Sequence, residues 1–146
     1  MICAGYCAYG SATELVITYG HGIQRFTLDP SLGEFILTAD NMTLPPKCKE
    51  IYSVNDGNYL TWDKPMQTAV DNFKFNQVDG KVKSYTARYV GSMVADVHRT
   101  LMYGGIYLYP ADAAKGNGKL RILYEAFPMA MIMEQAGGEA NTGEKK

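Results

Sequence analysis

Residues 88–101 read RYVGSMVADVHRTL and predict a loop that becomes a helix. Ser92 is a good N-cap candidate, because its hydroxyl can accept a hydrogen bond from an unpaired N–H of the first turn. Apolar residues recur at helical spacing and form one stripe: Val90, Met93, Val94, Val97 and Leu101. Gly104 and Gly105 then end the helix, since glycine readily adopts a left-handed conformation.

Arg88 and Tyr89 lie just before this cap, beside the positive end of the helix dipole. An anion can be held at such a place by backbone N–H groups and a guanidinium together. The same pattern also fits an ordinary amphipathic helix with a basic flank. The segment alone leaves both interpretations open.

The composition is that of a globular protein. The chain has 146 residues, 47% of them hydrophobic and 20% charged, with a net charge of -1. These values fit one domain and predict neither a nucleic-acid-binding nor a membrane-binding surface. The apolar runs are too short to span a bilayer, and residues 1–4 do not resemble a signal peptide. Cys3, Cys7 and Cys48 favour separate thiols in a reducing compartment.

The N-terminal third predicts β-strands. Residues 13–19 are β-rich, residues 23–28 alternate imperfectly, and residues 34–38 return as a strand. Turn signals at 20–22 and 29–33 separate them, so residues 1–38 are expected to form an antiparallel meander of two hairpins. His21 stands between glycines and is expected to be exposed.

The middle of the chain predicts a helix and a short strand. Residues 63–73 fit a helix with Met66, Val70 and Phe73 on one side, and residues 76–84 a polar surface excursion. Residues 105–109 are β-rich and end at Pro110.

The C-terminal part combines cations with a second apolar helix. If residues 119–122 are extended, Lys119 and Arg121 share one face, where they and the Tyr109 hydroxyl could meet a phosphate; a solvated basic face is the alternative. Pro128 suits the first turn of a helix, and Gly137 and Gly138 end it. The core-facing residues of that helix are Met129, Ile132, Met133 and Ala136.

Many segments, in one order, resemble fructose-1,6-bisphosphatase of the class 1 type. The run at 88–101 continues as MYGGIYLYP at 102–110. Other matching segments are GY at 5–6, YGSA at 9–12, LDP at 28–30, GEF at 33–35, IYS at 51–53, NDG at 55–57, GKLR at 118–121, LYE at 123–125 and EQAGG at 134–138. The resemblance covers the C-terminal half of such an enzyme, without the end of that half.

The resemblance implies an α/β (α+β-like layered) fold, in which a mixed, largely antiparallel sheet packs with helices as a truncated sugar-phosphatase fold. Residues 1–45 would carry the last strands of the N-terminal allosteric and metal domain. Residues 46–146 would form an incomplete C-terminal fructose-bisphosphate-binding domain. Strand edges left without neighbours predict marginal stability or self-association.

The resemblance also implies a sugar-phosphate site. The implied substrate-binding residues are Asn55, Arg88, Tyr89, Tyr109, Lys119 and Arg121, with Tyr59, Ser92 and Met93 as further candidates. In the family, the arginine matching Arg88 reaches a neighbouring subunit of a homo-tetramer. Where many members have a phosphate-binding tyrosine, this chain has Asn58 with Tyr59 next to it.

Glu125 matches a carboxylate ligand of the catalytic divalent metal in the family. The implied ion is Mg²⁺, with Mn²⁺ or Zn²⁺ as alternatives. By itself the position also suits a carboxylate that complements a helix dipole. One carboxylate is a poor magnesium site, because Mg²⁺ requires octahedral oxygen ligation. The remaining ligands are not found in this sequence, and no catalytic residue is assigned to it.

The implied activity is hydrolysis of the 1-phosphate of fructose 1,6-bisphosphate to give fructose 6-phosphate, by metal-assisted attack of water, in gluconeogenesis or the Calvin cycle. The chain alone is expected to bind the sugar phosphate without turning it over. A sedoheptulose-1,7-bisphosphatase portion and a non-catalytic sugar-phosphate-binding module are the alternatives. The expected location is the cytoplasm, with the plastid as the alternative, and no nucleic-acid or membrane partner is expected.

Overall fold

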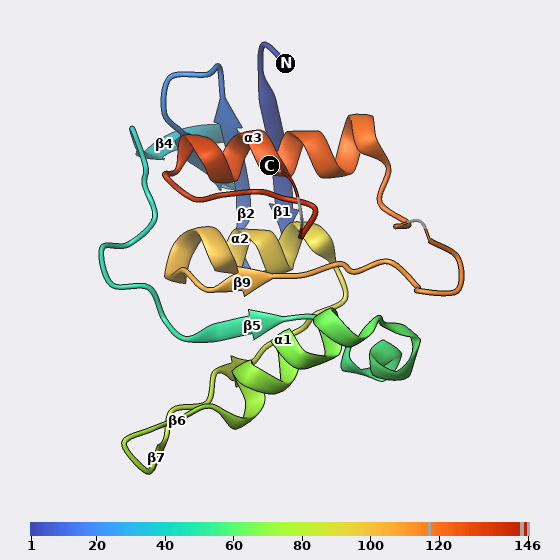
Figure 1. Cartoon of the computed structure of the whole chain (residues 1–146). Helices are drawn as coiled ribbons and strands as arrows, with labels where there is room; N and C mark the ends of the chain where they lie inside the picture. The colour runs from blue at the N-terminus through green and yellow to red at the C-terminus, as the bar shows by residue number, and fades with distance from the viewer. Residues whose placement is uncertain (117, 144, 146) are drawn as a thin grey trace. The chain divides into compact units, whose positions relative to one another are not determined.

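Two compact units make up the computed structural model, which describes residues 1–116, 118–143 and 145. The first unit contains Met1–Pro46 and Arg121–Lys146, and the second contains Lys47–Leu120. Both combine strands with helices (Figure 1), which confirms the α/β class. The division into domains at residues 45 and 46 stays a prediction.

The first unit is built on an antiparallel four-stranded sheet in the order β1-β2-β3-β4. Its strands are β1 (Ala4–Tyr9), β2 (Thr13–Thr18), β3 (Gln24–Asp29) and β4 (Glu34–Ala39). The expected meander is therefore confirmed. The β3–β4 turn is closed by Asp29, whose Oδ1 accepts from the N–H of Ser31 at 2.9 Å and from its hydroxyl at 2.6 Å.

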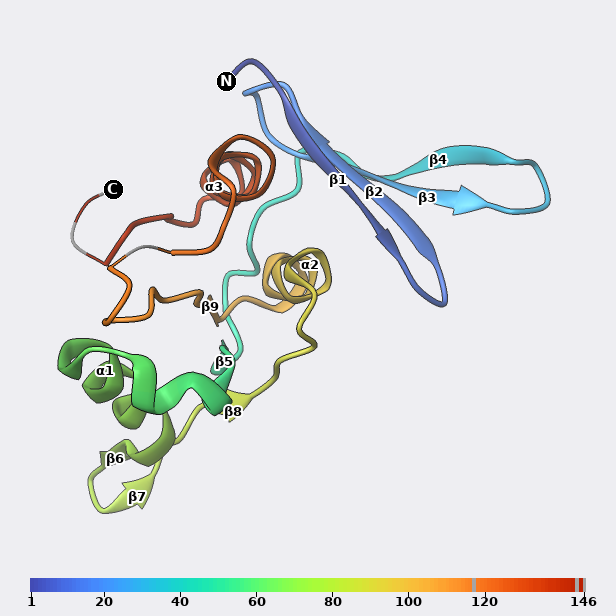
Figure 2. The ribbon, with the colours of Figure 1, turned by 90° about the vertical axis from the view of Figure 1, so that its right-hand side faces the viewer.

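Helix α3 (Phe127–Gln135) packs on β1 and β2, and the β3–β4 hairpin extends beyond it (Figure 2). The helix follows a single π-helical turn, η2 (Ile122–Ala126). Gly137 adopts φ +85° just beyond it, as expected for a glycine that ends a helix. The buried apolar residues of this unit are Ala4, Tyr6, Val16, Ile23, Met129, Ile132 and Ala136.

The second unit is built on a small parallel sheet. The central strand β5 (Ile51–Ser53) pairs with β8 (Thr86–Ala87) on one side and β9 (Ile106–Tyr107) on the other. The parallel pairing here and the antiparallel sheet of the first unit agree with the expected mixed, largely antiparallel pairing. Parallel strands need long crossover connections, and helices supply them here, with α1 (Lys64–Phe75) between β5 and β8 and α2 (Met93–Tyr103) between β8 and β9.

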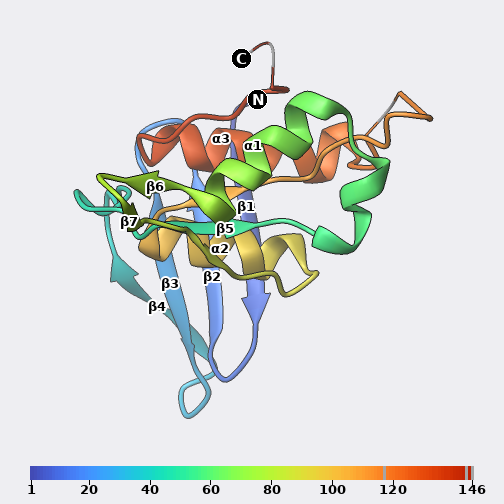
Figure 3. The ribbon, with the colours of Figure 1, turned by 60° about the horizontal axis from the view of Figure 1, so that its bottom comes forward.

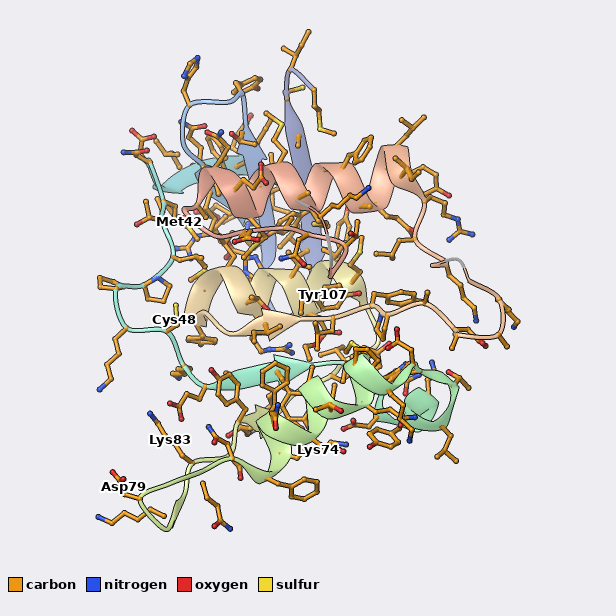
Figure 4. All side chains as sticks on the ribbon, viewed as in Figure 1. Met42, Cys48, Lys74, Asp79, Lys83 and Tyr107 are labelled. Atoms are coloured by element: carbon orange, nitrogen blue, oxygen red, sulfur yellow. The ribbon has the colours of Figure 1, made fainter. Side chains whose placement is uncertain are left out.

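Helix α1 confirms the predicted apolar face. The buried cluster of this unit is Tyr52, Val54, Trp62 and Val70, with Tyr59, Met66, Phe73, Tyr85 and Leu108 packed against it. A 3-10 helix, η1 (Asp56–Thr61), connects β5 to α1. The excursion at 76–84 is a hairpin of β6 (Gln77–Val78) and β7 (Lys81–Val82), which follows α1 (Figure 3) and carries Asp79 at its turn (Figure 4).

Helix α2 begins after Ser92 and ends at Gly104, whose φ is +76°. Val97 and Leu101 are buried, as the stripe predicts. Val90 is 67% exposed, so its inclusion in the stripe is wrong: it precedes the helix and does not share its periodicity. Among the described helices, none has the length and apolar character that a membrane span requires.

Candidate functional site

A small hollow, open to solvent, lies within the second unit. It is lined by Val54, Asn55, Asn58, Trp62, Tyr89, Leu108, Tyr109 and Pro110. Asn55 follows β5, Tyr89 follows β8 and Tyr109 follows β9, so the hollow lies beyond the carboxyl ends of all three parallel strands. Ligands bind at this edge in open parallel sheets.

The sheet hydrogen bonds continue past the strand ends and position these side chains. The N–H of Arg88 donates to the carbonyl of Tyr52 at 3.0 Å, and the N–H of Leu108 donates to the carbonyl of Ser53 at 2.9 Å. Tyr89 and Tyr109 each follow one of these bonded residues. The backbone therefore holds both tyrosines at the hollow.

Asn55 has one side of its amide already occupied. Its Oδ1 accepts from the N–H of Gly57 at 3.2 Å and so caps η1. An asparagine amide has one accepting oxygen and one donating nitrogen. With the oxygen on the cap, the Nδ2 group is the part of Asn55 that can donate to a ligand.

Each of the two tyrosines at the hollow carries a phenol O–H, which can donate a hydrogen bond. Desolvation, and secondarily the negative charges of an ionised Tyr109 and of Asp96, raise the pKa of Tyr89 above its ordinary value. The phenol therefore keeps its proton. Among the described residues that line the hollow none is acidic, and the polar ones carry amide or phenol groups. Such donors suit a ligand rich in acceptor oxygens, such as a phosphate.

The backbone N–H groups expected to hold an anion before α2 are occupied by a side chain of the helix. The N–H of Val90 lies 3.0 and 3.1 Å from the two carboxylate oxygens of Asp96, and the N–H of Gly91 lies 3.1 Å from Oδ2. Ser92 is the N-cap residue but its side chain makes no capping bond. The N-cap position of Ser92 is confirmed, but the capping bond expected from its hydroxyl is absent. The N–H groups of Val90 and Gly91, before the helix, are bonded to Asp96, so they are not open to an anion in this structure.

Other candidates are not among the residues that line the hollow. Arg88 is exposed and its Nη1 donates to the carbonyl of Ala87 at 3.0 Å, and Lys119 is exposed. Tyr59 donates from its hydroxyl to Oδ2 of Asp71 at 2.7 Å, and this bond raises the pKa of Tyr59. Ser92 and Met93 also lie outside the lining set. The binding roles of these residues stay predictions.

Arg121 and Glu125 belong to the first unit. Glu125 Oε2 accepts from the N–H of Arg121 at 2.7 Å, and Oε1 lies 3.4 Å from Nη1 of the same arginine. The condition that residues 119–122 are extended is not met at Ile122, where the π-helical turn begins. Within residues 1–116, 118–143 and 145, no three His, Cys, Asp or Glu side chains gather into a potential metal site.

Family models match both parts of the chain. The model described as the fructose-1-6-bisphosphatase N-terminal domain matches residues 1–40, and the C-terminal domain model matches residues 44–146. The chain belongs to the fructose-1,6-bisphosphatase family. This confirms the family resemblance seen in the sequence.

Its relatives include the cytosolic fructose-1,6-bisphosphatases of Arabidopsis thaliana, 59% identical, and of Oryza sativa subsp. japonica, 57% identical, each aligned over all of this chain. The chain spans 42% of the length of these two relatives. The fructose-1,6-bisphosphatase of Saccharomyces cerevisiae is 57% identical over 96% of this chain and 40% of its own length.

A solved structure supports the same fold. The apo form of Leishmania major fructose-1,6-bisphosphatase is 57% identical, with a TM-score of 0.87 over 94% of this chain and 42% of the solved chain. The sugar-phosphatase fold expected from the sequence is thereby confirmed.

Asn58 and Trp62, which line the hollow, and Asp96, which holds the loop before α2, were not assigned to a site from the sequence. Asn58 lies in η1 and Trp62 directly follows it, so the segment that comes after β5 brings both to the hollow. The available signal was the short strand at 51–53 followed by a turn, since loops at carboxyl strand ends carry ligand sites. For Asp96 the signal was an acidic residue in the first helical turn, where a carboxylate meets unpaired N–H groups.

Proposed function

We propose that the hollow beyond β5, β8 and β9 binds the phosphate of a sugar phosphate, as part of a fructose-1,6-bisphosphatase. The reaction is hydrolysis of fructose 1,6-bisphosphate to fructose 6-phosphate and inorganic phosphate. The supporting observation is that Asn55, Tyr89 and Tyr109, from three separate loops, line one hollow with donors. The name of the family indicates a substrate with phosphate groups, and phosphate oxygens accept hydrogen bonds from such donors.

Exposed cations are further candidates for phosphate binding by family resemblance: Arg88 and Lys119 of the second unit and Arg121 of the first. A positive charge on the donor strengthens a hydrogen bond to phosphate. By family resemblance Arg88 serves the site of a neighbouring subunit, so we propose a homo-oligomer, a tetramer in the family. The relatives named cytosolic support a cytosolic location.

Glu125 is proposed as one ligand of a divalent ion, Mg²⁺ by family resemblance, with Mn²⁺ or Zn²⁺ as alternatives. Its carboxylate already accepts from Arg121, and the described residues gather no trio of metal-binding side chains. A magnesium site needs more oxygen ligands than this. The described residues therefore do not fit a complete metal site, and no step of the reaction is assigned to a metal held by them.

The same observation favours a second candidate function. A chain that binds the sugar phosphate through the hollow but does not bring metal-binding carboxylates together would act as a sugar-phosphate-binding module. The two candidates share the binding site and differ in turnover.

The binding test uses Trp62, the only tryptophan in the sequence, which lines the hollow. Its fluorescence is expected to change on titration of the 146-residue chain with fructose 6-phosphate, and not with fructose. Asn55→Asp is the sharpest variant, because it keeps the oxygen that caps η1 and replaces the donating Nδ2 by a charged oxygen. We expect affinity to fall more than about tenfold, since a hydrogen bond to a charged group is lost and a repulsion is added.

Matched controls separate the site from general effects. Asn72→Asp makes the same change at an exposed position of α1 and is expected to leave affinity unchanged. Tyr109→Phe removes only the hydroxyl at the hollow, and Tyr103→Phe removes the hydroxyl of another half-exposed tyrosine of the same unit. Equal affinities for Asn55→Asp and Asn72→Asp would refute the proposed site.

A second assay distinguishes the two candidate functions. Phosphate released from fructose 1,6-bisphosphate in the presence of Mg²⁺ is measured for the same chain. Release that scales with protein and disappears in Glu125→Gln supports hydrolysis. Binding without release supports the binding module.

A further inference from the structure

The backbone is fixed on both sides of Tyr89. Before it, the N–H of Arg88 donates to the carbonyl of Tyr52, and the carbonyl of Arg88 accepts from Nη2 of Arg99 at 3.0 Å. After it, the N–H groups of Val90 and Gly91 donate to the Asp96 carboxylate. The side chain between these fixed points lines the hollow.

The group that fixes this loop is a buried ion pair. The Asp96 side chain is 0% exposed, and Nη1 of Arg99 donates to its Oδ1 at 2.8 Å, so Asp96 and Arg99 hold the two ends of the loop together. A buried carboxylate is costly unless it is paired and hydrogen-bonded, and here both conditions are met. The carboxylate reaches past the N-cap Ser92 to two residues outside the helix, which helix capping alone does not require.

Gly91 makes the sharp turn that this arrangement needs. Its φ is +87°, in the left-handed region that favours glycine. A Cβ built at Gly91 would lie 3.8 Å from Cε1 of Tyr89, so one edge of the ring lies next to the turn.

We propose that Asp96 and Arg99 are positioning residues of the sugar-phosphate site: they hold the loop at 88–91 so that the Tyr89 hydroxyl meets the phosphate. This inference rests on the proposed function, because it assigns Tyr89 a phosphate ligand. Neither residue is among those that line the hollow, so both act through Tyr89.

The test is a double-mutant cycle on the 146-residue chain, with the dissociation constant for fructose 6-phosphate measured by Trp62 fluorescence. Tyr89→Phe and Asp96→Asn are each expected to raise this constant about tenfold to a hundredfold, which is the effect of losing one hydrogen bond to a charged group. The dissociation constant of the double variant is expected to be no higher than that of the more impaired single variant, since both changes remove the same contact. If the two fold-increases multiply in the double variant, the positioning role is overturned.

If Asp96→Asn does not fold, Arg99→Lys provides a second test of the positioning role. Lysine keeps a positive charge beside Asp96 but cannot donate to Asp96 and to the Arg88 carbonyl with a planar fork. We expect Arg99→Lys to weaken binding and to do so only when Tyr89 is present. Asp29→Asn is the matched control for Asp96→Asn. The Asp29 carboxylate also accepts backbone N–H groups of a turn, but that turn belongs to the first unit, so the affinity for fructose 6-phosphate should not change.

An amide NMR spectrum gives a readout that needs no ligand. The Val90 and Gly91 amide signals should move in Asp96→Asn while the remaining dispersed signals stay. A folded wild-type chain that ignores fructose 6-phosphate overturns the proposed function, and this inference with it. Wild-type binding that Asp96→Asn and Arg99→Lys leave intact overturns this inference alone.

Discussion

The phenolic O–H of Tyr52 donates to Oδ2 of Asp56 across 3.2 Å. Tyr52 lies on the central strand of the parallel sheet and is 3% exposed, while Asp56 begins η1 directly after the pocket residue Asn55. Lys74 on α1 (Figure 4) completes the contact, with Nζ 2.8 Å from Oδ1 of Asp56. Strand β5, the 3-10 helix η1 and helix α1 thus meet at the Asp56 carboxylate.

This pairing makes stability depend on pH in the alkaline range. Desolvation, and then the charge of Asp56, raise the pKa of Tyr52 from 10.0 to about 12. Because the folded-state pKa is raised, the stabilising contribution is complete below pH 10 and is lost as pH rises from 10 to about 12. Urea unfolding at several pH values should show that the free energy of unfolding falls less over this range in Tyr52→Phe than in the wild-type chain. Parallel falls would contradict the assignment.

The two helix N-caps should respond differently to alanine. Oδ1 of Asp63 accepts from the N–H of Met66 at 2.9 Å, whereas the side chain of Ser92 makes no such bond. Asp63→Ala is expected to lower the free energy of unfolding by about 0.5–2 kcal/mol, the usual effect of losing a cap. Ser92→Ala, measured by the same urea unfolding, should lower it less. A larger loss for Ser92→Ala would contradict the absence of a capping bond at Ser92.

Truncation of the α3 core contact tests the first unit. Ile132 is fully buried on the helix that packs on β1 and β2. Ile132→Ala should lower the free energy of unfolding by about 2–5 kcal/mol, through lost apolar burial and the cavity that remains. Ile2→Ala removes the same atoms from a side chain that is 88% exposed and should change it little. Thermal and urea unfolding of both variants provide the comparison.

Gly104 combines a special conformation with close packing. A Cβ there would collide with Cβ and Sγ of Cys48 and lie 2.8 Å from its Cα, and φ is +76°. Gly104→Ala should therefore destabilise the second unit by more than the about 1–3 kcal/mol that a left-handed non-glycine residue costs. Gly116→Ala isolates the backbone cost, since its φ is +68° and nothing lies within 4 Å. Equal losses for the two variants would argue against the contact with Cys48.

Local patterns in the sequence predict the helices and the antiparallel strands well. The α2 stripe of Val97 and Leu101 and its end at Gly104 follow from helical periodicity and glycine conformation alone. The parallel pairing of β5, β8 and β9 was not predicted, because strands of two or three residues carry too little alternation and their partners lie far away in the chain.

The candidate site shows the same limit. The family motifs select Asn55, Tyr89 and Tyr109, and the structure brings all three to one hollow. The hydrogen bond from Tyr59 to Asp71, and the occupation of the Val90 and Gly91 N–H groups by Asp96, depend on side-chain directions that spacing does not report.

The hollow at the ends of three parallel strands has a consequence for folding. Its walls come from segments separated by helical crossover connections, so the complete site forms only after β5, β8 and β9 have paired. The chain loses entropy when distant segments are brought together, before their contacts form, and this loss slows their formation. A ligand that recognises only the closed arrangement therefore stabilises the second unit as a whole, and its concentration shifts the unfolding midpoint by mass action.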